Sequence, residues 1–463
     1  MKNRLHIGFL LMMMSFYLTA CKKDFLDKKP NKALLIPETL QDVKLLLDNS
    51  GVVFNISPGL NVISADEYVT EESTLLALDN YERNSYLWEK EVYPGTDGVG
   101  DWDIPYQQVF YANIALEALD KLNPPMKDRK EWSRLKGIAL FYRGFAFYNL
   151  ARLFAVKYDK QTADQLQGIP LRLKSTINIP SIRASLQDSY HRIIEDITTA
   201  KGLLSPNEQI KTRPDKKAAF ALLARVFLSM EEYTSAGSYA DSCLNLQNEL
   251  INYNTIDGSG AGIPFPAALP TGNQEILFFS SCIRYEFPTF NPDIVINPMI
   301  YKTYEDNDLR KLLFFGDFYE DGRMTFRGTY TGSNNGALFS GLATDEMYLI
   351  RAECFARENR VVDAMAWLNK LLITRWRKNT YLDKVASNNT EALQIILSER
   401  NKELITRGLR WDDLKRLNKD PIYATELVRN INGKLYRLEP NDLRYVFPIP
   451  DNEIAHGMIQ NPR

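Results

Sequence analysis

The segment from Lys136 to Ala155 constrains what this chain can fold into more than any other. It reads KGIALFYRGFAFYNLARLFA, and its strongly polar residues are Lys136, Arg143, Asn149 and Arg152. A helix with this sequence is apolar nearly all round, so neighbouring helices must cover most of its surface. The segment therefore predicts a helix that packs between others in a large core.

Other helices are predicted in pairs. The stretch 185–204 is amphipathic, with apolar residues recurring every three to four positions. A helical hairpin is predicted over 217–246 with its turn at 231–233, and a second over 345–374 with its turn near Asn359. Paired helices in units of about 34 residues are typical of the tetratricopeptide fold. Any α-helical bundle has the same periodicity, so a bundle is the alternative.

Two stretches differ in character from these helical pairs. Residues 251–340 contain the glycine-rich run 258–262 and several prolines, which exclude a helix there, while 275–285 predicts a strand or a strand pair. Residues 55–105 also contain aromatic residues interspersed with glycines. The predicted fold is therefore mainly α, a tetratricopeptide-like helical-hairpin scaffold with a large irregular loop-rich insertion carrying short β-strands. Loops on such a scaffold are typical of binding surfaces.

The composition excludes several classes of function. Lys and Arg total 56 against 58 Asp and Glu, so the chain lacks the basic field of a dedicated nucleic-acid binder. Three His and four Cys are too few and too scattered for a zinc cluster. The sequence contains no G-x-S-x-G, no H-E-x-x-H and no phosphate-binding P-loop. We therefore expect no cofactor, no metal and no nucleic-acid partner.

Paired carboxylates do not predict a hydrolase either. The candidates are three pairs of adjacent residues: Asp66-Glu67, Glu71-Glu72 and Asp412-Asp413. A glycosidase needs two carboxylates that face each other across a cleft, roughly 5 to 10 Å apart. Neighbouring residues on a helix or strand point their side chains in different directions. The sequence therefore predicts that the protein is not an enzyme.

The N-terminal residues have the form of an export signal. Two basic residues open the chain, an apolar run spans 7–18, and the run ends in Leu18-Thr19-Ala20-Cys21, which looks like a bacterial lipobox. We expect residues 1–20 to be a lipoprotein signal peptide and Cys21 to carry the lipid anchor. A plain secretory signal and an N-terminal transmembrane helix are the alternatives.

Cleavage before Cys21 would leave three further thiols, Cys243, Cys282 and Cys354. An odd number of thiols in an oxidising compartment argues against a disulfide framework. Cys243 and Cys354 lie among apolar residues at helical spacing, so we expect them in the core. A bridge between one pair is the less favoured alternative.

Segments in a fixed order along the whole chain resemble the SusD/RagB family of nutrient-binding outer-membrane lipoproteins. The two most specific are the segment LSERNKELITRGLRWDDLKRL (397–417) and the closing YVFPIPDNEIAHGMIQNP (445–462). The others are CKKDFLDKKP after the lipobox, YQQVFYANIALEAL (106–119), LARLFAVKY followed by GIPL (168–171), SYHRIIEDITTAKGLL, RPDKKAAFALLARVFLSMEEYTSAGSYAD (213–241) and DEMYLIRAECFARENRVVDAMAWLNKL (345–371). Thr406-Arg407-Gly408 departs from the Phe-Glu-Gly that the family often has.

The resemblance implies a single domain over 21–463, with helical pairs at about 106–246 and 344–417. The loop-rich regions at about 55–105 and 251–340 would face the ligand. It further implies a non-enzymatic binding protein, anchored in the outer membrane and displayed on the surface. Its partners would be a SusC-like TonB-dependent transporter and an oligosaccharide, or in some cases a peptide. A tetratricopeptide scaffold or peptide-binding lipoprotein of the cell envelope is the alternative.

Candidate ligand contacts follow from sugar chemistry. Pyranose rings lay their C–H faces on aromatic side chains, and polar side chains at the rim bind the hydroxyl groups. The aromatic residues in glycine-rich or loop-like stretches are Trp88, Trp102, Tyr285, Tyr319 and Tyr330. Each could instead fill the core, as most large aromatic residues do. The remaining tryptophans lie in helical segments and are predicted to pack there.

Overall fold

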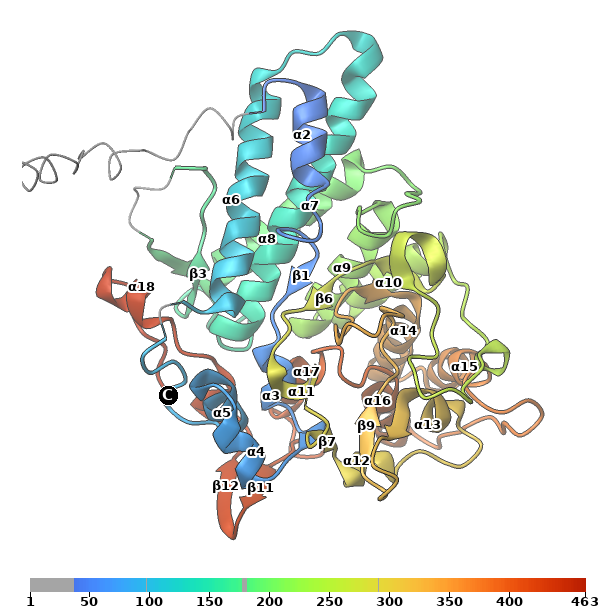
Figure 1. Cartoon of the computed structure of the whole chain (residues 1–463). Coiled ribbons are helices and arrows are strands. Elements are labelled where there is room, and N and C mark those ends of the chain that lie inside the picture. Colours follow the sequence, from blue (N-terminus) through green and yellow to red (C-terminus); the bar gives the residue numbers. More distant parts are fainter. Residues whose placement is uncertain (1–36, 97, 177–180, 290) are drawn as a thin grey trace, which may run out of the picture.

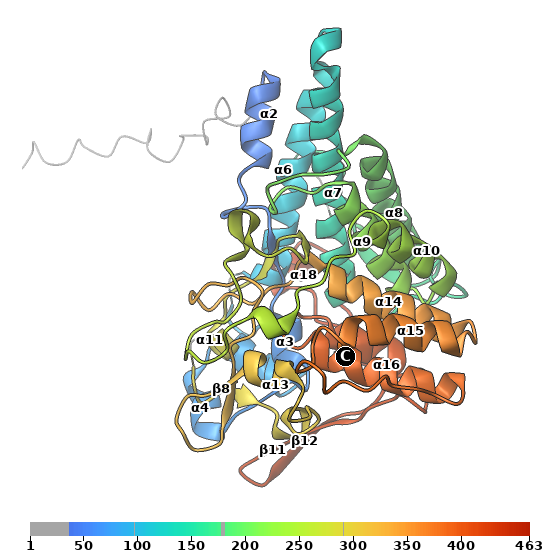
Figure 2. The ribbon, with the colours of Figure 1, turned by 90° about the vertical axis from the view of Figure 1, so that its right-hand side faces the viewer.

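A stack of paired helices and an irregular half rich in loops make up the protein (Figures 1 and 2). The computed structural model describes residues 37–463 except 97, 177–180 and 290. Cys21 and the signal-peptide prediction lie outside these residues.

The helices lie side by side in much of the chain. The α-helices are α2 (Leu40–Leu47), α3 (Leu60–Ser64), α4 (Glu72–Ala77), α5 (Asn80–Tyr86), α6 (Gly100–Lys121), α7 (Arg129–Phe154), α8 (Leu186–Leu203), α9 (Lys216–Ser229), α10 (Tyr233–Leu244), α11 (Glu286–Thr289), α12 (Pro298–Tyr301), α13 (Leu309–Phe314), α14 (Thr344–Arg357), α15 (Val361–Leu372), α16 (Asn389–Glu403), α17 (Arg410–Leu417) and α18 (Asp451–Ala455). Short turns of other helix types are η4 (Met126–Asp128), η5 (Tyr253–Thr255), η6 (Ala268–Gly272) and η7 (Leu443–Tyr445).

The strands are short and form two-stranded sheets only, as far as the described residues go. They are β1 (Ile56–Ser57), β2 (Tyr68–Val69), β3 (Gln167–Pro170), β4 (Arg183–Ser185), β5 (Ile276–Phe278), β6 (Ser281–Cys282), β7 (Val295–Ile296), β8 (Phe315–Asp317), β9 (Met324–Phe326), β10 (Leu342–Ala343), β11 (Leu427–Ile431) and β12 (Lys434–Leu438). The pairs are β1–β6, β2–β7, β3–β4, β5–β10, β8–β9 and β11–β12.

Helix α7 confirms the prediction made for the apolar segment. Every residue from Gly137 to Phe154 is buried, because α6 and α8 pack along it (Figure 1). Gly144 sits where α7 crosses α8, and a Cβ atom there would lie 2.8 Å from Cγ1 of Ile197. The glycine therefore lets the two backbones approach closely.

The predicted helical hairpins are also confirmed. Helices α9 and α10 form one and α14 and α15 the other, and α10 packs against α14 so that the pairs stack. Their turns use Glu231 and Asn359, with φ of 61° and 60°. These left-handed residues end each first helix and reverse the chain. The fold is mainly α and tetratricopeptide-like, as predicted.

Strand pairs join the two loop-rich regions. Parallel β1–β6 brings 56–57 beside 281–282, and antiparallel β2–β7 brings 68–69 beside 295–296. The expected strand or strand pair at 275–285 is instead two strands with different partners: β5 pairs with β10, and β6 with β1. Segments more than 200 positions apart therefore meet, and any site at this junction is built from both regions.

The structure corrects one local prediction. Trp102 was assigned to a loop-like stretch, but it lies in the first turn of α6, which begins at Gly100. Asp101 and Asp103 occupy the same turn, where acidic residues interact favourably with the helix dipole. The glycines before residue 100 hid this helix start.

Buried arginines connect the loop-rich half to the helices. Arg375 pairs with Glu275 and with Glu403 of α16, at 2.9 and 2.7 Å, and all three side chains are fully buried. Arg310 pairs with Glu403 and Glu399 of the same helix, at 3.0 and 2.6 Å. Burial raises the pKa of the Glu275 carboxyl to about 7 although Arg375 opposes the shift. These charges depend on one another because water does not reach them.

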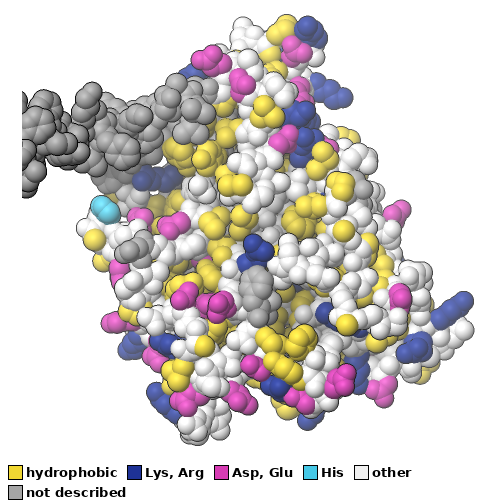
Figure 3. Space-filling model, viewed as in Figure 1, with side chains coloured by type: hydrophobic (Ala, Val, Ile, Leu, Met, Phe, Trp, Pro, Cys, Tyr) yellow, Lys and Arg dark blue, Asp and Glu magenta, His cyan; other side chains and the backbone are white. Residues whose placement is uncertain are grey.

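The surface carries mixed charge. Figure 3 shows acidic and basic side chains interspersed over one face, with hydrophobic side chains between them. Cys243, Cys282 and Cys354 are buried free thiols, in agreement with the expectation of a core without bridges among them. Within the described residues, no helix is both long enough and apolar enough to span a bilayer.

We predict that Arg375→Met destabilises the protein strongly. The substitution leaves Glu275 and Glu403 buried without this partner, and breaking a buried pair in this way costs about 3–5 kcal/mol. Urea unfolding followed by circular dichroism measures the change. Arg437→Met removes an exposed pair with Glu426 and is the control, with an almost unchanged free energy of unfolding. Equal effects of the two variants would contradict the role given to Arg375.

Candidate ligand-binding site

A cleft opens where the two loop-rich regions meet. It has a volume of about 230 Å³ and is called the tyrosine cleft here. Its walls come from the start of α3, from α5, from the loop before α6, and from the segment after β6. The lining residues are Leu60, Tyr81, Tyr93, Thr96, Gly98, Val99, Gly100, Ile283 and Tyr285.

Two tyrosine rings form an aromatic surface in this cleft. Tyr81 and Tyr285 have ring centroids 5.6 Å apart and planes inclined by 57°. Both side chains are half-buried, so part of each ring stays accessible. The Tyr81 hydroxyl donates to Oδ2 of Asp79 at 2.8 Å, which fixes the ring from outside the cleft. The pair offers a sugar ring an apolar surface.

A third tyrosine supplies an unused polar group. Tyr93 is 4% exposed, and among the described residues its hydroxyl has no hydrogen-bond partner. Buried hydroxyl groups almost always have such a partner. Because Tyr93 lines the cleft, a ligand hydroxyl could supply the missing bond.

The buried carboxylate of Asp101 holds the cleft together from behind. It accepts hydrogen bonds from the backbone N–H of Gly59 and Leu60, at 2.8 and 2.9 Å, and from the Tyr285 hydroxyl. Burial raises the pKa of Asp101 to about 6, although these three bonds oppose the shift. One side chain therefore ties α6, the start of α3 and Tyr285 into a fixed geometry.

A glycine lets the Tyr285 segment lie close to α3. A Cβ atom on Gly59 would lie 2.8 Å from the carbonyl oxygen of Ile283 and 3.1 Å from the Tyr285 ring. Since a backbone oxygen cannot swing aside as a flexible side chain can, any larger residue would push the segment outward. Gly59 is therefore required for the shape of the cleft.

A second cavity continues from the first across Ile283. It has a volume of about 440 Å³ and a more polar lining, which includes Ser50, Asn55, Arg284 and Asn335. The Asn55 amide donates to the carbonyl oxygens of residues 212 and 279, at 2.9 and 2.7 Å. Its own carbonyl oxygen is buried and has no partner in the described part of the chain. The two cavities share Ile283 in their linings, so they are neighbours.

The other predicted contacts lie elsewhere. Trp88 and Tyr330 are 2% and 1% exposed, so they fill the core, which was the alternative for each. The Trp88 indole donates to the carbonyl oxygen of Ser64 at 2.9 Å. The Tyr330 hydroxyl donates to Glu275 at 2.8 Å. Neither ring offers a face to a ligand.

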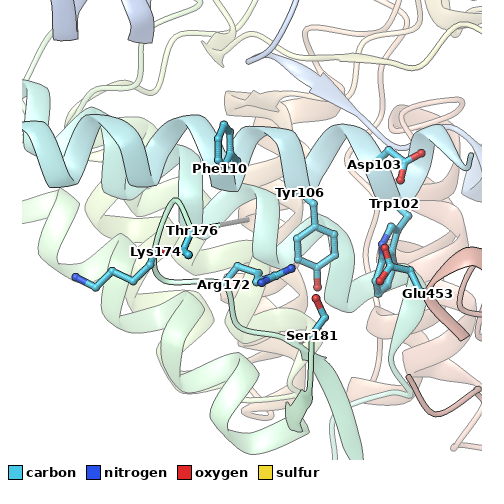
Figure 4. Close-up of a pocket in the computed structure, with 9 residues that line it drawn as sticks. All are labelled: Trp102, Asp103, Tyr106, Phe110, Arg172, Lys174, Thr176, Ser181 and Glu453. Atoms are coloured by element: carbon cyan, nitrogen blue, oxygen red, sulfur yellow. The ribbon is translucent and has the colours of Figure 1, made fainter. Parts of the chain in front are cut away.

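The last two predicted residues differ in their exposure to solvent. Tyr319 is 41% exposed near the turn between β8 and β9, with the Arg323 guanidinium 4.5 Å from its ring centre. Trp102 is 2% exposed but borders a different pocket on the outer side of α6 (Figure 4). Of the five predicted aromatic residues, Tyr285 alone lines the tyrosine cleft.

Sequence reasoning did not select Tyr81 and Tyr93. The stretch NYERNSY is polar, so the ring of Tyr81 gave no sign of partial burial beside another aromatic residue. Tyr93 lies between the helices α5 and α6, in the aromatic and glycine-rich stretch noted above. That position was the only sequence signal that could have marked it as a ligand contact. The candidates were chosen for their glycine-rich or loop-like surroundings, yet most large aromatic residues are largely buried.

The adjacent carboxylates have structural roles. Their partners are arginine side chains in the pairs Asp66–Arg410, Asp412–Arg152 and Asp413–Arg400, at 2.7 to 2.8 Å. Glu67 accepts the backbone N–H of Thr406 at 2.7 Å. Over the described residues, no three His, Cys, Asp or Glu side chains gather in a way that could hold a metal ion.

Family models match most of the chain. One described as "Starch-binding associating with outer membrane" matches residues 24–228, and one described as "SusD family" matches residues 342–463. A SusD-like protein of Formosa agariphila is 22% identical over 398 residues, which cover 72% of this chain and 74% of that protein.

Solved structures share the fold. A putative sugar-binding protein of Bacteroides vulgatus has a TM-score of 0.74 at 21% identity, over 92% of this chain and 99% of that one. A SusD superfamily protein of Bacteroides thetaiotaomicron has the same TM-score and identity, over 92% and 100%. A SusD-like carbohydrate-binding protein of Bacteroides vulgatus reaches 0.66 at 19% identity, over 91% and 97%.

We predict a specific pH dependence from Asp101. Its pKa is about 6 in the folded protein against 3.8 in a free side chain, so the folded state binds the proton more tightly. The contribution of Asp101 to the free energy of unfolding is therefore greatest below about pH 4. It falls by roughly 3 kcal/mol as the pH rises to about 6.

The comparison with Asp101→Asn isolates this effect. The amide oxygen can still accept the N–H groups of Gly59 and Leu60, but the side chain does not titrate. Urea unfolding of both proteins between pH 4 and 7 should give a difference in unfolding free energy that shifts in favour of the variant up to about pH 6 and then stays constant. A difference independent of pH would contradict the burial of the carboxyl.

Proposed function

The chain belongs to the SusD/RagB family, and from that premise we propose that it is a binding protein that captures oligosaccharides in the tyrosine cleft without catalysing a reaction. The observation that carries this proposal is the cleft itself. It combines two accessible tyrosine rings with the buried, unpartnered hydroxyl of Tyr93. An apolar surface beside an unsatisfied polar group suits a sugar, which has apolar ring faces and hydroxyl edges.

The second cavity, which shares Ile283 with the tyrosine cleft, supports an oligosaccharide as the ligand rather than a single sugar. Beyond Ile283 the lining becomes polar, and the buried carbonyl oxygen of Asn55 can accept a hydroxyl donor. Fold relatives are described as sugar-binding and carbohydrate-binding proteins, which favours the same ligand class. The proposal of binding without catalysis is supported by the ion pairs that Asp66, Asp412 and Asp413 form with arginine side chains.

The anchor and the transporter belong to the same proposal. The family description includes association with the outer membrane. Cys21 would be acylated after removal of residues 1–20, so the protein would stand on the membrane through lipid alone. The helical pairs would then face a SusC-like TonB-dependent transporter, while the loops face the ligand. Closure over the transporter would deliver the captured oligosaccharide.

We predict that Tyr81→Ala weakens oligosaccharide binding at least about tenfold, because it removes one of the two stacking surfaces, a loss of about 1.4 kcal/mol. Calorimetric titration of residues 22–463 with host, plant and microbial oligosaccharides would measure the affinity. Tyr81→Phe keeps the ring and should retain most of it. Tyr436→Ala, a half-buried tyrosine on β12, is the matched control and should bind as wild type.

Other outcomes would redirect the proposal. If no oligosaccharide binds, or if Tyr81→Ala binds as well as wild type, the tyrosine cleft is not the capture site. Binding of peptides in the same titration would favour the peptide-binding alternative. Tyr319→Ala, tested alongside, asks whether an exposed ring outside the cleft also contacts the ligand.

We predict that Cys21→Ser abolishes lipid attachment. The thiol is the acylation site, so metabolic labelling with a palmitate analogue should label the wild-type protein and not the variant. Labelling that persists in Cys21→Ser would overturn the lipobox interpretation.

A further inference from the structure

A second pocket lies on the outer side of α6, separate in its lining from the tyrosine cleft. Its volume is about 230 Å³, and the residues around it are labelled in Figure 4. It is called the α6 pocket here. Helix α6 forms one wall, the segment around residues 172–176 forms the other, and α18 closes one end through Glu453.

The α6 wall is a stripe of aromatic rings. Trp102, Tyr106 and Phe110 are spaced four residues apart, so they lie on the same face of the helix. The rings of Trp102 and Tyr106 are 4.8 Å apart, and Trp102 packs edge-on against Phe154 at 4.9 Å. Tyr106 and Phe110 are half-buried and keep accessible surface. This wall offers the apolar surface that a sugar ring needs.

The opposite wall is fixed to α6 by hydrogen bonds. The Tyr106 hydroxyl donates to the carbonyl oxygen of Pro170 at 3.0 Å, and the Asn113 amide donates to that of Arg172 at 2.9 Å. Glu117 accepts both the N–H and the hydroxyl of Ser175, at 2.9 and 2.7 Å. The backbone that carries Arg172 and Lys174 is therefore held in place before any ligand arrives, which lowers the entropic cost of binding.

Charge is distributed unevenly along the pocket. Arg172 lies beside Tyr106, Lys174 lines the same end of the pocket with its amine directed away from the rings, and Asp103 and Glu453 lie at the Trp102 end (Figure 4). Lys174 is exposed and forms no ion pair with any described residue. The Arg172 guanidinium lies against the accessible Tyr106 ring, and the exposed Lys174 side chain lies at the same end of the pocket (Figure 4). Such a pairing suits a ligand that joins an apolar ring face to an anionic group.

From these observations we propose that the α6 pocket binds a saccharide residue that carries an anionic group, such as a hexuronic acid. Its ring lies on Tyr106 and Phe110, and its carboxylate lies by Arg172 and Lys174. Its hydroxyls at the far end donate to Asp103 and Glu453. The proposal rests on the proposed function only in that the ligand is a saccharide, and it concerns a different site.

Monosaccharide probes test the proposal without assuming a linkage. Methyl glucuronide and methyl galacturonide are compared with methyl glucoside and methyl galactoside, which lack the carboxylate. Binding to the full chain is followed by saturation-transfer NMR in low and high salt. We expect at least fivefold tighter binding of an acidic glycoside than of its neutral counterpart, and a weaker preference at high salt, since the attraction is partly between exposed charges.

Substitutions assign the binding to the pocket. Lys174→Gln should weaken binding of the acidic glycoside at least fivefold and leave binding of the neutral glycoside unchanged. Lys378→Gln, an exposed lysine elsewhere on the surface, is the matched control and should change neither. Phe110→Ala should weaken both glycosides, because it removes part of the ring surface.

The results separate this proposal from the proposed function. Equal binding of acidic and neutral glycosides, or an unchanged affinity in Lys174→Gln, overturns the anionic α6 pocket. Loss of acidic binding in Tyr81→Ala and not in Lys174→Gln also overturns it, because the sugar would then occupy the tyrosine cleft. Failure of neutral oligosaccharides to bind at the tyrosine cleft affects the proposed function and leaves these comparisons intact. Sulfated methyl galactoside, run in parallel, tells whether sulfate can replace carboxylate; its failure would narrow the ligand to carboxylates.

Discussion

Buried arginine side chains are the interaction on which the loop-rich half depends. Irregular segments leave backbone carbonyl groups that no helix or sheet satisfies, and a guanidinium has enough donors to bind them and a carboxylate together. Arg225 donates to Glu346 and to the carbonyl oxygen of Gly341. Arg429 reaches the three successive carbonyl groups of residues 63–65. Arg375 donates to the carbonyl oxygen of Ile251 and pairs with the carboxylates of Glu275 and Glu403. Buried arginines thus act as charged anchors, and the loops gain fixed positions without forming extended sheets.

The same principle, with the charges reversed, shapes the tyrosine cleft. Asp101 presents a carboxylate to two loop N–H groups and to the Tyr285 hydroxyl. Because the carboxylate is buried at the start of α6, the tyrosine ring is positioned from a long helix that packs along α7. A binding surface that is ordered before the ligand arrives loses less conformational entropy on binding. Irregular loops can therefore form a specific site, because a buried side chain, here Asp101, fixes their backbone.

The sequence was informative where one residue type has one structural meaning. Helices followed from apolar spacing, and the turn expected near Asn359 lies there, with a φ of 60° at Asn359. Aromatic residues in loops were ambiguous, because a ring of given size can fill the core or face a ligand. Tyr330 is buried by contacts with Glu275, a residue 55 positions away, and no local pattern predicts such a contact. The pairing of β1 with β6 joins segments still farther apart. Predictions therefore failed where burial and pairing were decided by distant parts of the chain.

The first turn of α6 belongs to both pockets. Val99 and Gly100 line the tyrosine cleft, whereas Trp102 and Asp103 line the α6 pocket. The Asp103 carboxylate also accepts the N–H of Val99 at 3.0 Å, so a group in one pocket fixes the backbone of the other. Burial raises the pKa of Asp103, although the hydrogen bond from the Val99 N–H opposes the shift. Substitutions within the turn must change both pockets together. Only side chains outside it belong to a single pocket, and they alone can show which pocket a given saccharide occupies.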